Sequence, residues 1–381
     1  MGKIRVLSRG SFLCGKKDIV NAFIWWYDHF TKTFTHTAER ERRREMAYTI
    51  KDVAKKANVS IATVSRILNN QKGYSEQTKK KVLKAIEELD YHPNAIARGL
   101  INKKTSTIGV LFPALSSMLA TELLAGIEKT AHELGSSVIV CHTESNGLKT
   151  MKYLQLLNEK RVDGIIFTSE ILKEEYYEFI QKMNIPLVLL STESRAYPVP
   201  YVKVDDRRAA YAAVQYLIKQ GHKRIGMISG NDQDMIAGKP RIEGYVDAMS
   251  DYGLPADDSF IARMKGFKFS DGTEGLKLLK KQLPDVTAVF AASDDIAVGA
   301  ISSAYRLGIR VPDDLSIIGY DNLKIADMTI PPLTSLAQPF YEMGEKAAQM
   351  IFDLMDGDEL IESRIMPHSI AERNSVLKLE S

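Results

Sequence analysis

A short polar-faced segment, residues 61–68, carries side chains whose types and spacing suit contact with nucleic acid. Its apolar residues repeat at helical spacing, which predicts one buried side and leaves Ile61, Ala62, Ser65 and Arg66 facing outward. A narrow helix with such a face fits the major groove, where arginine can bind a guanine edge or a phosphate and small apolar side chains can contact thymine methyl groups. The residues placed to bind phosphates are Thr49, Thr63 and Asn69.

Two short helices joined by a turn are expected to position this face. Apolar residues at helical spacing predict helices over residues 50–57 and 61–68. Between them, Asn58 tolerates the left-handed conformation of a tight turn, and Ser60 suits the N-cap of the second helix. This pattern is a helix-turn-helix; a three-helix unit with a solvated basic surface is the alternative. A third helix is expected from Ser75 to about Leu89, with an apolar stripe of Val82, Leu83, Ile86 and Leu89.

The charge of the chain is unevenly distributed along its length. The 381 residues carry 51 Lys and Arg against 48 Asp and Glu, a net charge of +3. Residues 1–45 carry a net +5, residues 46–104 a net +7 and residues 105–381 a net −9. A small basic part is therefore joined to a large acidic part, and only the basic part suits a polyanion such as DNA.

Short apolar runs alternate with amphipathic helices from residue 107 onward. This alternation is typical of parallel sheets covered by helices. Because the runs fall into two sets, we expect a two-lobed α/β body preceded by the all-α helix-turn-helix domain. The strands are expected at 107–112, 137–141, 163–168 and 187–190 and, in the second set, at 224–229, 286–291 and 315–319.

Several side chains that could bind a small molecule follow the predicted strands. In parallel sheets, ligands bind beyond the carboxyl ends of the strands, here in the cleft between the lobes. Four of these residues have structural alternatives: a helix N-cap for Asp294, a surface ion pair for Arg241, a turn stabiliser for Asp321 and plain core packing for Phe267. The candidate cleft residues are Ser117, Leu119, Ser191, Arg241, Phe267, Ser293, Asp294 and Asp321.

No motif for catalysis or metal binding is present in the sequence. It lacks a GxSxG elbow, a GxxxxGK[ST] phosphate loop and an HExxH zinc motif, and its seven histidines are scattered. Two cysteines, Cys14 and Cys141, exclude a disulfide framework and fit a reducing cytoplasm. The sequence therefore predicts no enzyme, no metal and no cofactor, and its apolar runs are shorter than the roughly 20 residues of a membrane helix.

Two stretches, TIKDVAKKANVSIATVSRILN and LDYHPNAIARGL, closely resemble the lactose/galactose-repressor (LacI/GalR) family of bacterial regulators. The resemblance covers residues 47–377 and implies a periplasmic-binding-protein architecture for the two lobes. It also implies that Ile61, Ala62 and Arg66 read bases. Residues Asn94 to Leu100 match the hinge helix, which in the family orders on operator DNA and pairs with its dimer mate. Leu100 matches a leucine wedged into the minor groove, and the small Ala97 lets the hinge lie deep in that groove.

The resemblance also implies roles within the cleft. Arg241 and Asp321 match positions that hydrogen-bond effector hydroxyl groups, and Phe267 matches an aromatic side chain that stacks on the ligand ring. This donor, acceptor and aromatic face suit a polyhydroxylated sugar. The chain departs from many relatives at residues 118–120, where Met-Leu-Ala replaces aromatic or polar residues, so a larger or less polar ligand is also consistent.

The interpretation favoured by the resemblance is a cytoplasmic, homodimeric repressor of carbohydrate-utilisation genes. It would bind a pseudo-palindromic operator in double-stranded DNA, with its affinity controlled by a sugar-like effector. One alternative is a catabolite regulator switched by a phosphorylated phosphocarrier protein. Residues 201–345 resemble the catabolite-control branch of the family, and Arg306 and Arg310 could meet a phosphoserine. The other is a solute-binding protein without DNA function, against which the basic residues 46–104 and the lack of a clear signal peptide argue.

This interpretation divides the chain into four parts. Residues 1–45 are an extension expected to be disordered or not native, with Met46 as the hypothetical natural start. Residues 46–92 form the helix-turn-helix domain, and residues 93–104 form the hinge helix and linker. Residues 105–381 form the effector-binding and dimerisation domain. Its first lobe takes in about 105–205 and 338–367, and its second about 206–337 and 368–381.

Overall fold

The computed structural model describes residues 48–68, 72–91, 104–114, 117–144, 147, 149–358 and 361–379. The chain divides into two compact units on either side of the Arg98–Gly99 bond, and each unit is described by itself. The predictions for residues 1–45, Asn69, Asn94, Ala97 and Leu100 lie outside the described residues.

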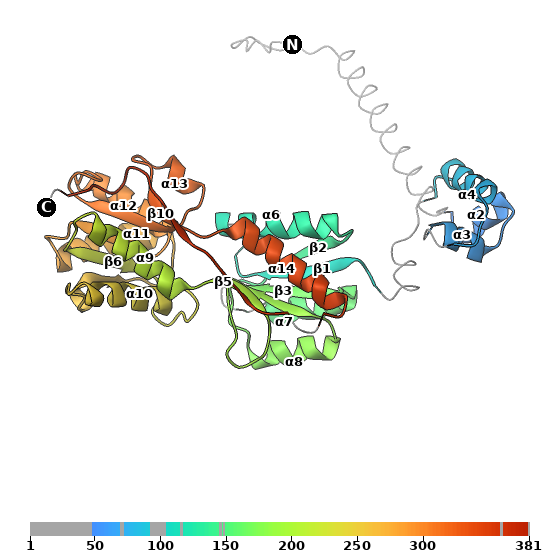
Figure 1. The fold of residues 1–381 in the computed structure, drawn as a ribbon, viewed down its shortest axis with the longest axis horizontal. Coiled ribbons are helices and arrows are strands. Elements are labelled where there is room, and N and C mark those ends of the chain that lie inside the picture. The colour runs from blue at the N-terminus through green and yellow to red at the C-terminus, as the bar shows by residue number, and fades with distance from the viewer. Residues whose placement is uncertain are drawn as a thin grey trace, which may run out of the picture. The chain divides into compact units, whose positions relative to one another are not determined.

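In the described part of the smaller unit, three helices pack around a small apolar core (Figure 1). They are α2 (Ile50–Ala57), α3 (Ile61–Leu68) and α4 (Glu76–Glu88). Asn58 ends α2 with φ 52° and ψ 51°, the expected left-handed conformation. Ser60 Oγ accepts a hydrogen bond from the Thr63 N–H at 3.1 Å, so it caps α3 as predicted. These local signals fix the angle at which the chain leaves α2 and enters α3.

The predicted apolar stripe on α4 is wrong at one residue, Leu83. Leu83 is 49% exposed, whereas Val82 and Ala85 are buried against α2 and α3. Ile86 and Leu89 pack at the edge of the same core. The buried face of α4 therefore keeps Val82, Ile86 and Leu89 as expected and contains Ala85 in place of Leu83.

The larger unit has two lobes, each built on a six-stranded sheet. The sheet of lobe one runs β11-β5-β4-β3-β1-β2, with every neighbouring pair parallel. Its strands are β1 (Thr107–Phe112), β2 (Ser137–His142), β3 (Gly164–Thr168), β4 (Leu187–Leu190), β5 (Tyr201–Val204) and β11 (Arg364–Met366).

Helices cover both faces of this first sheet, so its strands are apolar on both sides. Ile166 and Val188 face α6 (Met118–Glu133) and α14 (Phe340–Met355). Their neighbours Ile165 and Leu189 face α7 (Thr150–Lys160) and α8 (Glu174–Met183). This alternation is the two-residue period of a strand, and it explains why the sequence shows continuous apolar runs.

Lobe two has the same doubly covered architecture. Its sheet runs β12-β10-β9-β8-β6-β7, and only the edge strand β12 among these pairs against its neighbour in the antiparallel sense. The strands are β6 (Ile225–Ser229), β7 (Ile261–Arg263), β8 (Ala288–Ala291), β9 (Ser316–Asp321), β10 (Thr334–Ala337) and β12 (Ser369–Ala371). The helices are α9 (Asp206–Lys219), α10 (Gly238–Asp251), α11 (Phe269–Gln282), α12 (Asp294–Arg306), the short α13 (Ile325–Met328) and the 3₁₀ helix η1 (Asp258–Phe260).

Three crossover segments join the lobes, and they lie side by side. They connect β5 to α9, β10 to α14 and β11 to β12. Val204 is in register with Met366, and Ala337 is in register with Ser369, so adjacent pairing brings the three passes together. These three neighbouring segments form the connection between the two lobes.

Among the described helices, none combines the length and the apolar character that crossing a bilayer requires. Within the same described ranges, no three His, Cys, Asp or Glu side chains are grouped as metal ligands would be.

The close crossing of α6 and α14 in lobe one depends on Gly126. A Cβ atom at this position would lie 2.0 Å from the Tyr341 carbonyl oxygen, which belongs to the backbone of α14. We expect Gly126→Ala to force the helices apart and to lower the free energy of unfolding by about 1–3 kcal/mol. Urea denaturation of the purified chain measures this loss.

Gly266→Ala is the matched control for this prediction. A Cβ there would meet only the end of the Asp271 side chain at 3.4 Å, so its unfolding midpoint should stay close to that of the parent chain. Equal midpoints for both variants and the parent would contradict the tight crossing.

Candidate functional site

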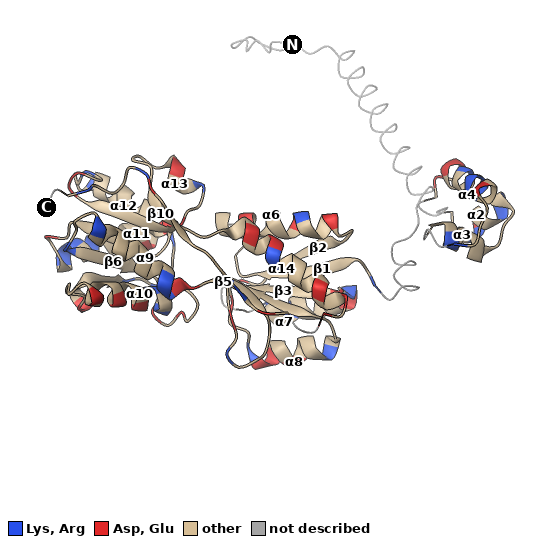
Figure 2. Ribbon diagram, viewed as in Figure 1, with Lys and Arg blue, Asp and Glu red and all other residues tan. Residues whose placement is uncertain are grey.

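The outward face of α3 is available for contact with DNA. Ile61 is 45% exposed, Ala62 and Arg66 are also exposed, and Thr63 and Ser65 are half-buried. Lys and Arg residues lie on all three helices of this unit (Figure 2). The structure thus presents the predicted base-contacting residues together on one helix, on a unit of positive charge.

Thr49, one of the predicted phosphate ligands, has a structural role as well. It is the N-cap of α2, and its hydroxyl donates to Asp52 Oδ2 at 2.7 Å. The Thr49 N–H donates to the same oxygen at 2.8 Å, which completes a capping box. These hydrogen bonds lower the pKa of Asp52. Thr49 remains exposed at the helix N-terminus, where a phosphate would bind.

A cavity of about 240 Å³ lies between the two lobes of the larger unit. Its walls come from strand ends and helix starts of both lobes, as expected for ligands of parallel sheets. The structure brings together seven of the eight predicted residues here, namely Ser117, Leu119, Ser191, Arg241, Phe267, Ser293 and Asp321.

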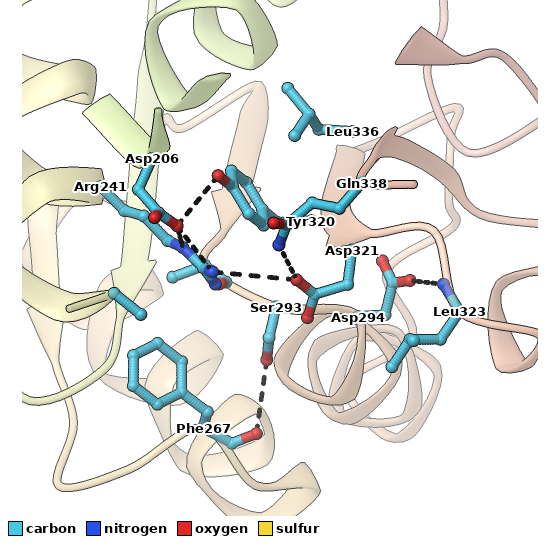
Figure 3. A network of polar contacts seen from close by, with 12 residues as sticks. Asp206, Arg241, Phe267, Ser293, Asp294, Tyr320, Asp321, Leu323, Leu336 and Gln338 are labelled. Atoms are coloured by element: carbon cyan, nitrogen blue, oxygen red, sulfur yellow. Dashed lines mark hydrogen bonds and ion pairs between the residues drawn. The ribbon is translucent and has the colours of Figure 1, made fainter. Parts of the chain in front are cut away.

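The buried guanidinium of Arg241 organises the lobe-two side of this cavity (Figure 3). Its Nε and Nη2 atoms donate to Asp206 Oδ1 at 3.1 and 2.9 Å, and Nη1 donates to the Ala292 carbonyl at 2.7 Å. The guanidinium also lies 3.8 Å from the centroid of the Tyr320 ring, whose hydroxyl donates to the same Asp206 oxygen at 3.2 Å. The alternative of a surface ion pair is therefore wrong for Arg241, because this ion pair is buried.

Burial and neighbouring groups determine the pKa values of Arg241 and Tyr320. Burial opposes the charge of Arg241, but Tyr320, Asp206 and Asp321 outweigh it and raise the pKa of the guanidinium. Burial raises the pKa of Tyr320 well above its ordinary value, and Asp206 adds to this effect. The cavity wall therefore holds a permanent cation, Arg241, which packs against the buried neutral phenol of Tyr320.

Asp321 is the second carboxylate beside Arg241. It ends β9 with φ 111°, its Oδ1 atom accepts a hydrogen bond from Gln338 Nε2 at 2.8 Å, and the same atom lies 3.8 Å from Arg241 Nη2. Burial raises the pKa of Asp321 to about 7, although Arg241 and Gln338 pull it down. Its Oδ2 atom has no hydrogen bond to any residue that the structure describes, and Asp321 lines the cavity, where a ligand hydroxyl could bind it.

The structure corrects the prediction for Asp294. Its carboxylate is fully buried behind the cavity, where Oδ2 accepts from the Leu323 N–H and Oδ1 from Ser335 Oγ, both at 2.6 Å. The N-cap of α12 is Ser293, whose Oγ accepts from the Ile296 N–H at 3.2 Å. Asp294 is therefore neither a cavity-lining residue nor the N-cap, and the adjacent Asp295 lines the cavity instead.

Phe267 and Ser191 line the cavity from opposite lobes. The Phe267 ring packs over Gly230, where a Cβ atom would lie 2.3 Å from the ring, and it reaches the lobe-two core as well as the cavity. Ser191 follows β4 with φ 55°, and its buried Oγ atom has no hydrogen-bond partner. Ser117, by contrast, caps α6 by accepting from the Ala120 N–H at 3.2 Å.

Sequence reasoning missed several cavity residues. Lys203 and Asp206 belong to the end of β5 and the start of α9, and β5 is only four residues long and interrupted by that lysine. Gln338 lies on the second crossover segment. No strand was predicted before it, so the search for polar residues at strand ends did not find it. The missed polar residues are Ser169, Lys203, Asp206, Asp234, Asp295 and Gln338.

Comparison with known proteins agrees with both units. Residues 49–94 match the family model "Bacterial regulatory proteins, lacI family", and residues 214–376 match a periplasmic binding protein-like domain. Catabolite control protein A of Priestia megaterium is 39% identical over 332 residues, covering 87% of this chain and 99% of that protein.

Two solved structures are similar over most of this chain. A lac repressor dimer bound to operator and the anti-inducer ONPF matches with a TM-score of 0.78 and 27% identity, covering 87% of this chain and 99% of that one. A complex of the transcriptional regulator CelR with cellobiose matches with a TM-score of 0.66 and 28% identity, covering 86% and 99%.

The fold and the two sites define a helix-turn-helix transcriptional regulator with a two-lobed ligand-binding body. The chain belongs to the lacI family of bacterial regulatory proteins.

We expect Arg241→Ala to destabilise lobe two strongly. The change removes both hydrogen bonds that Arg241 donates to the buried Asp206 carboxylate and leaves only the Lys203 ammonium, 3.8 Å away, as its cation. Breaking a buried ion pair in this way costs about 3–5 kcal/mol. Thermal unfolding measures the effect, and Arg207→Ala is the control because Arg207 pairs with Asp247 at an exposed position. Similar losses in the two variants would contradict a special role for the buried guanidinium.

Asp321→Asn tests the raised pKa of this carboxyl. The native pKa of about 7 exceeds the ordinary 3.8, so the native state binds an extra proton between these values. The stability contributed by Asp321 is therefore highest below about pH 4, falls as pH rises towards 7 and is constant above that. The asparagine variant should gain stability relative to the parent over this window, measured by urea denaturation at several pH values.

Asp314→Asn serves as the control for this pH series. Arg310 lowers the pKa of Asp314 to about 2, so its protonation changes only below about pH 4. Its stability relative to the parent should be constant between pH 5 and 8. The same comparison is made for Asp321→Asn. If its free energy of unfolding relative to the parent is equally constant between pH 5 and 8, Asp321 stays ionised over that range.

Proposed function

We propose that this chain represses carbohydrate-utilisation genes by binding a specific operator, with its affinity set by a sugar-like effector in the cleft. It acts as a cytoplasmic homodimer, without enzymatic activity or a cofactor. The observation that carries the proposal is the cavity between the lobes. It pairs the buried Arg241 and Asp321 with the aromatic face of Phe267, in the same chain as the exposed face of α3.

The chemistry of the cavity suits a polyhydroxylated ligand. Arg241 has N–H groups left over after its bonds to Asp206 and Ala292, and Asp321 keeps one carboxylate oxygen for a hydroxyl donor. Phe267 offers an apolar face to the C–H edge of a sugar ring. The transcriptional regulator CelR was solved as a complex with cellobiose, which supports a carbohydrate as the ligand.

Closure of the cleft is the proposed link to DNA. Ser117 and Ser191 come from lobe one, whereas Arg241 and Asp321 come from lobe two, so a ligand that contacts both sides stabilises the closed state. An effector shifts the equilibrium only by its difference in affinity for the two states. Closure rotates lobe one, to which residues 93–104 connect the DNA-binding unit, and operator affinity changes with that rotation.

The proposed domain division follows from this mechanism. Residues 46–92 bind half of a pseudo-palindromic operator, residues 93–104 form the hinge, and residues 105–381 bind the effector and the second subunit. The proposed DNA ligands are Thr49, Ile61, Ala62, Thr63, Ser65, Arg66, Asn69, Asn94, Ala97 and Leu100. The lac repressor dimer bound to operator supports the dimeric arrangement.

A second candidate function is control by a phosphorylated phosphocarrier protein. The 39% identity to catabolite control protein A favours it, and Arg306 lies exposed beside Tyr305, which is 85% exposed. Arg310 is less available, because its Nε and Nη2 atoms already donate to the two oxygens of Asp314 at 2.9 and 2.7 Å. Operator affinity that is unchanged by the purified phosphoprotein would exclude this candidate.

An unbiased selection of DNA sites with the full chain tests the proposed function. We expect a palindrome with a central CG step, enriched at a stated salt concentration because phosphate contacts make affinity depend on salt. Arg66→Ala should cost about 1–3 kcal/mol and relax the preference at one base pair of each half-site.

Lys80→Ala is the matched control, since Lys80 is exposed on α4, away from the face of α3. It should change affinity by a similar factor for all sequences. Shallow, sequence-blind binding by the parent chain, with and without sugars, would contradict the proposal.

A further inference from the structure

The cavity between the lobes carries more negative charge than positive charge. Its lining contains two cations, Lys203 and Arg241, and four aspartates. Arg241 is paired with Asp206 at 2.9 Å and lies 3.8 Å from Asp321. Lys203 lies 3.8 Å from Asp206 and 4.0 Å from Glu193. Both cations therefore lie beside carboxylates close to the hinge. Neither of these two cations pairs with the remaining two aspartates that line the cavity.

Those two aspartates, Asp234 and Asp295, differ in the hydrogen bonds that their carboxylates accept. Asp234 Oδ1 accepts hydrogen bonds from the Ile236 N–H at 2.8 Å and the Ala237 N–H at 3.3 Å, so it stabilises a turn. Asp295 is half-buried in the first turn of α12 and has no hydrogen bond or ion pair to any residue that the structure describes. Burial raises the pKa of Asp295, and no neighbouring cation counteracts this effect.

On the lobe-one side of the cavity, a hydroxyl group and an ammonium group lack hydrogen-bond partners among the described residues. Ser191 Oγ is buried and makes no hydrogen bond, and it lines the cavity. The Lys203 side chain is only 10% exposed, and its ammonium has neighbouring carboxylates at ion-pair distance but none within hydrogen-bond distance. These groups require hydroxyl partners on the ligand, because a buried polar group left without a partner destabilises the closed state.

Cleft closure would bury Asp295 further. A neutral ligand would leave its carboxylate desolvated and unpaired, which is costly. An anionic ligand, such as a sugar phosphate or sugar acid, would add a charge of the same sign beside Asp295 and Asp321. A protonated amine would instead pair with Asp295 through a charge-assisted hydrogen bond.

Resting on the proposed function of the cleft as an effector site, we propose that the effector is a polyhydroxylated amine of the amino-sugar class. Asp295 is the residue that selects its amino group. The hydroxyl groups bind Arg241, Asp321 and the lobe-one groups, while the ammonium binds the unpaired carboxylate at the start of α12.

Matched sugar pairs test this inference by calorimetric titration of the full chain. The probes are glucosamine, galactosamine and mannosamine, each compared with its parent hexose, its N-acetyl derivative and its 6-phosphate. We expect at least one amine to bind about tenfold more tightly than its neutral and phosphorylated counterparts. Asp295→Asn should remove that preference, so that the amine and its parent hexose bind the variant with affinities within about twofold of each other.

Two further variants separate ligand selection from a merely structural role. Asp295→Glu retains the charge and should keep the preference for the amine. Glu175→Gln removes an exposed carboxylate from the same position in the first turn of α8, outside the cavity, and should change neither preference nor affinity. A carboxylate that only stabilises the helix terminus would affect thermal unfolding in both positions without affecting selectivity.

The inference is overturned if none of the amines binds, if a parent hexose or phosphate binds as tightly, or if the preference survives Asp295→Asn. The proposed function is judged separately by the selected operator and by whether any neutral or anionic sugar alters operator affinity. A neutral sugar that releases the operator would therefore reject the amine and keep the regulator.

Discussion

The buried charge of Arg241 is the constraint around which the ligand-binding body is arranged. A guanidinium in this position needs a carboxylate in contact, and Asp206 supplies it where the chain first enters lobe two. Tyr320 covers one face of the guanidinium, and the adjacent Asp321 lies at the end of the same strand, β9. Because the pair is buried, each member depends on the others, and losing one leaves a charge that water cannot reach.

This network also ties the cavity to the hinge. Asp206 follows the first crossover segment, and Gln338 lies on the second and donates to Asp321. The groups that face a ligand are therefore bonded to the segments about which the lobes turn. A ligand that binds Arg241 or Asp321 would therefore contact groups that are bonded directly to the crossover segments.

Much of the fold could be predicted from the sequence because its signals are local. The first two helices have the predicted bounds, since Asn58 and Ser60 fix their ends. The strands at 107–112 and 187–190 also match, because unbroken apolar runs mark them. The strand expected from residue 163 begins one residue later, at Gly164, and the Asp163 carboxylate accepts hydrogen bonds from the N–H groups of Thr105 and Thr107.

Elements and residues that depend on tertiary packing could not be predicted in this way. The short β5 contains Lys203, whose charge is tolerated only beside Asp206, so its pattern does not read as a buried strand. Asp294 and Asp295 are neighbours of the same type, and the rotation of α12 decides which one reaches the cavity. That rotation follows from the packing of α12 against α11, β8 and β9, which no local signal contains.

The three adjacent crossover segments restrict how this molecule can move. A single linker would let the lobes twist, slide and separate, whereas three neighbouring connections with paired strand ends oppose sliding and separation more than rotation. The conformational change is then close to one-dimensional. Ligands of different shape that bind between the lobes would then differ in how far they drive the same rotation rather than in its direction.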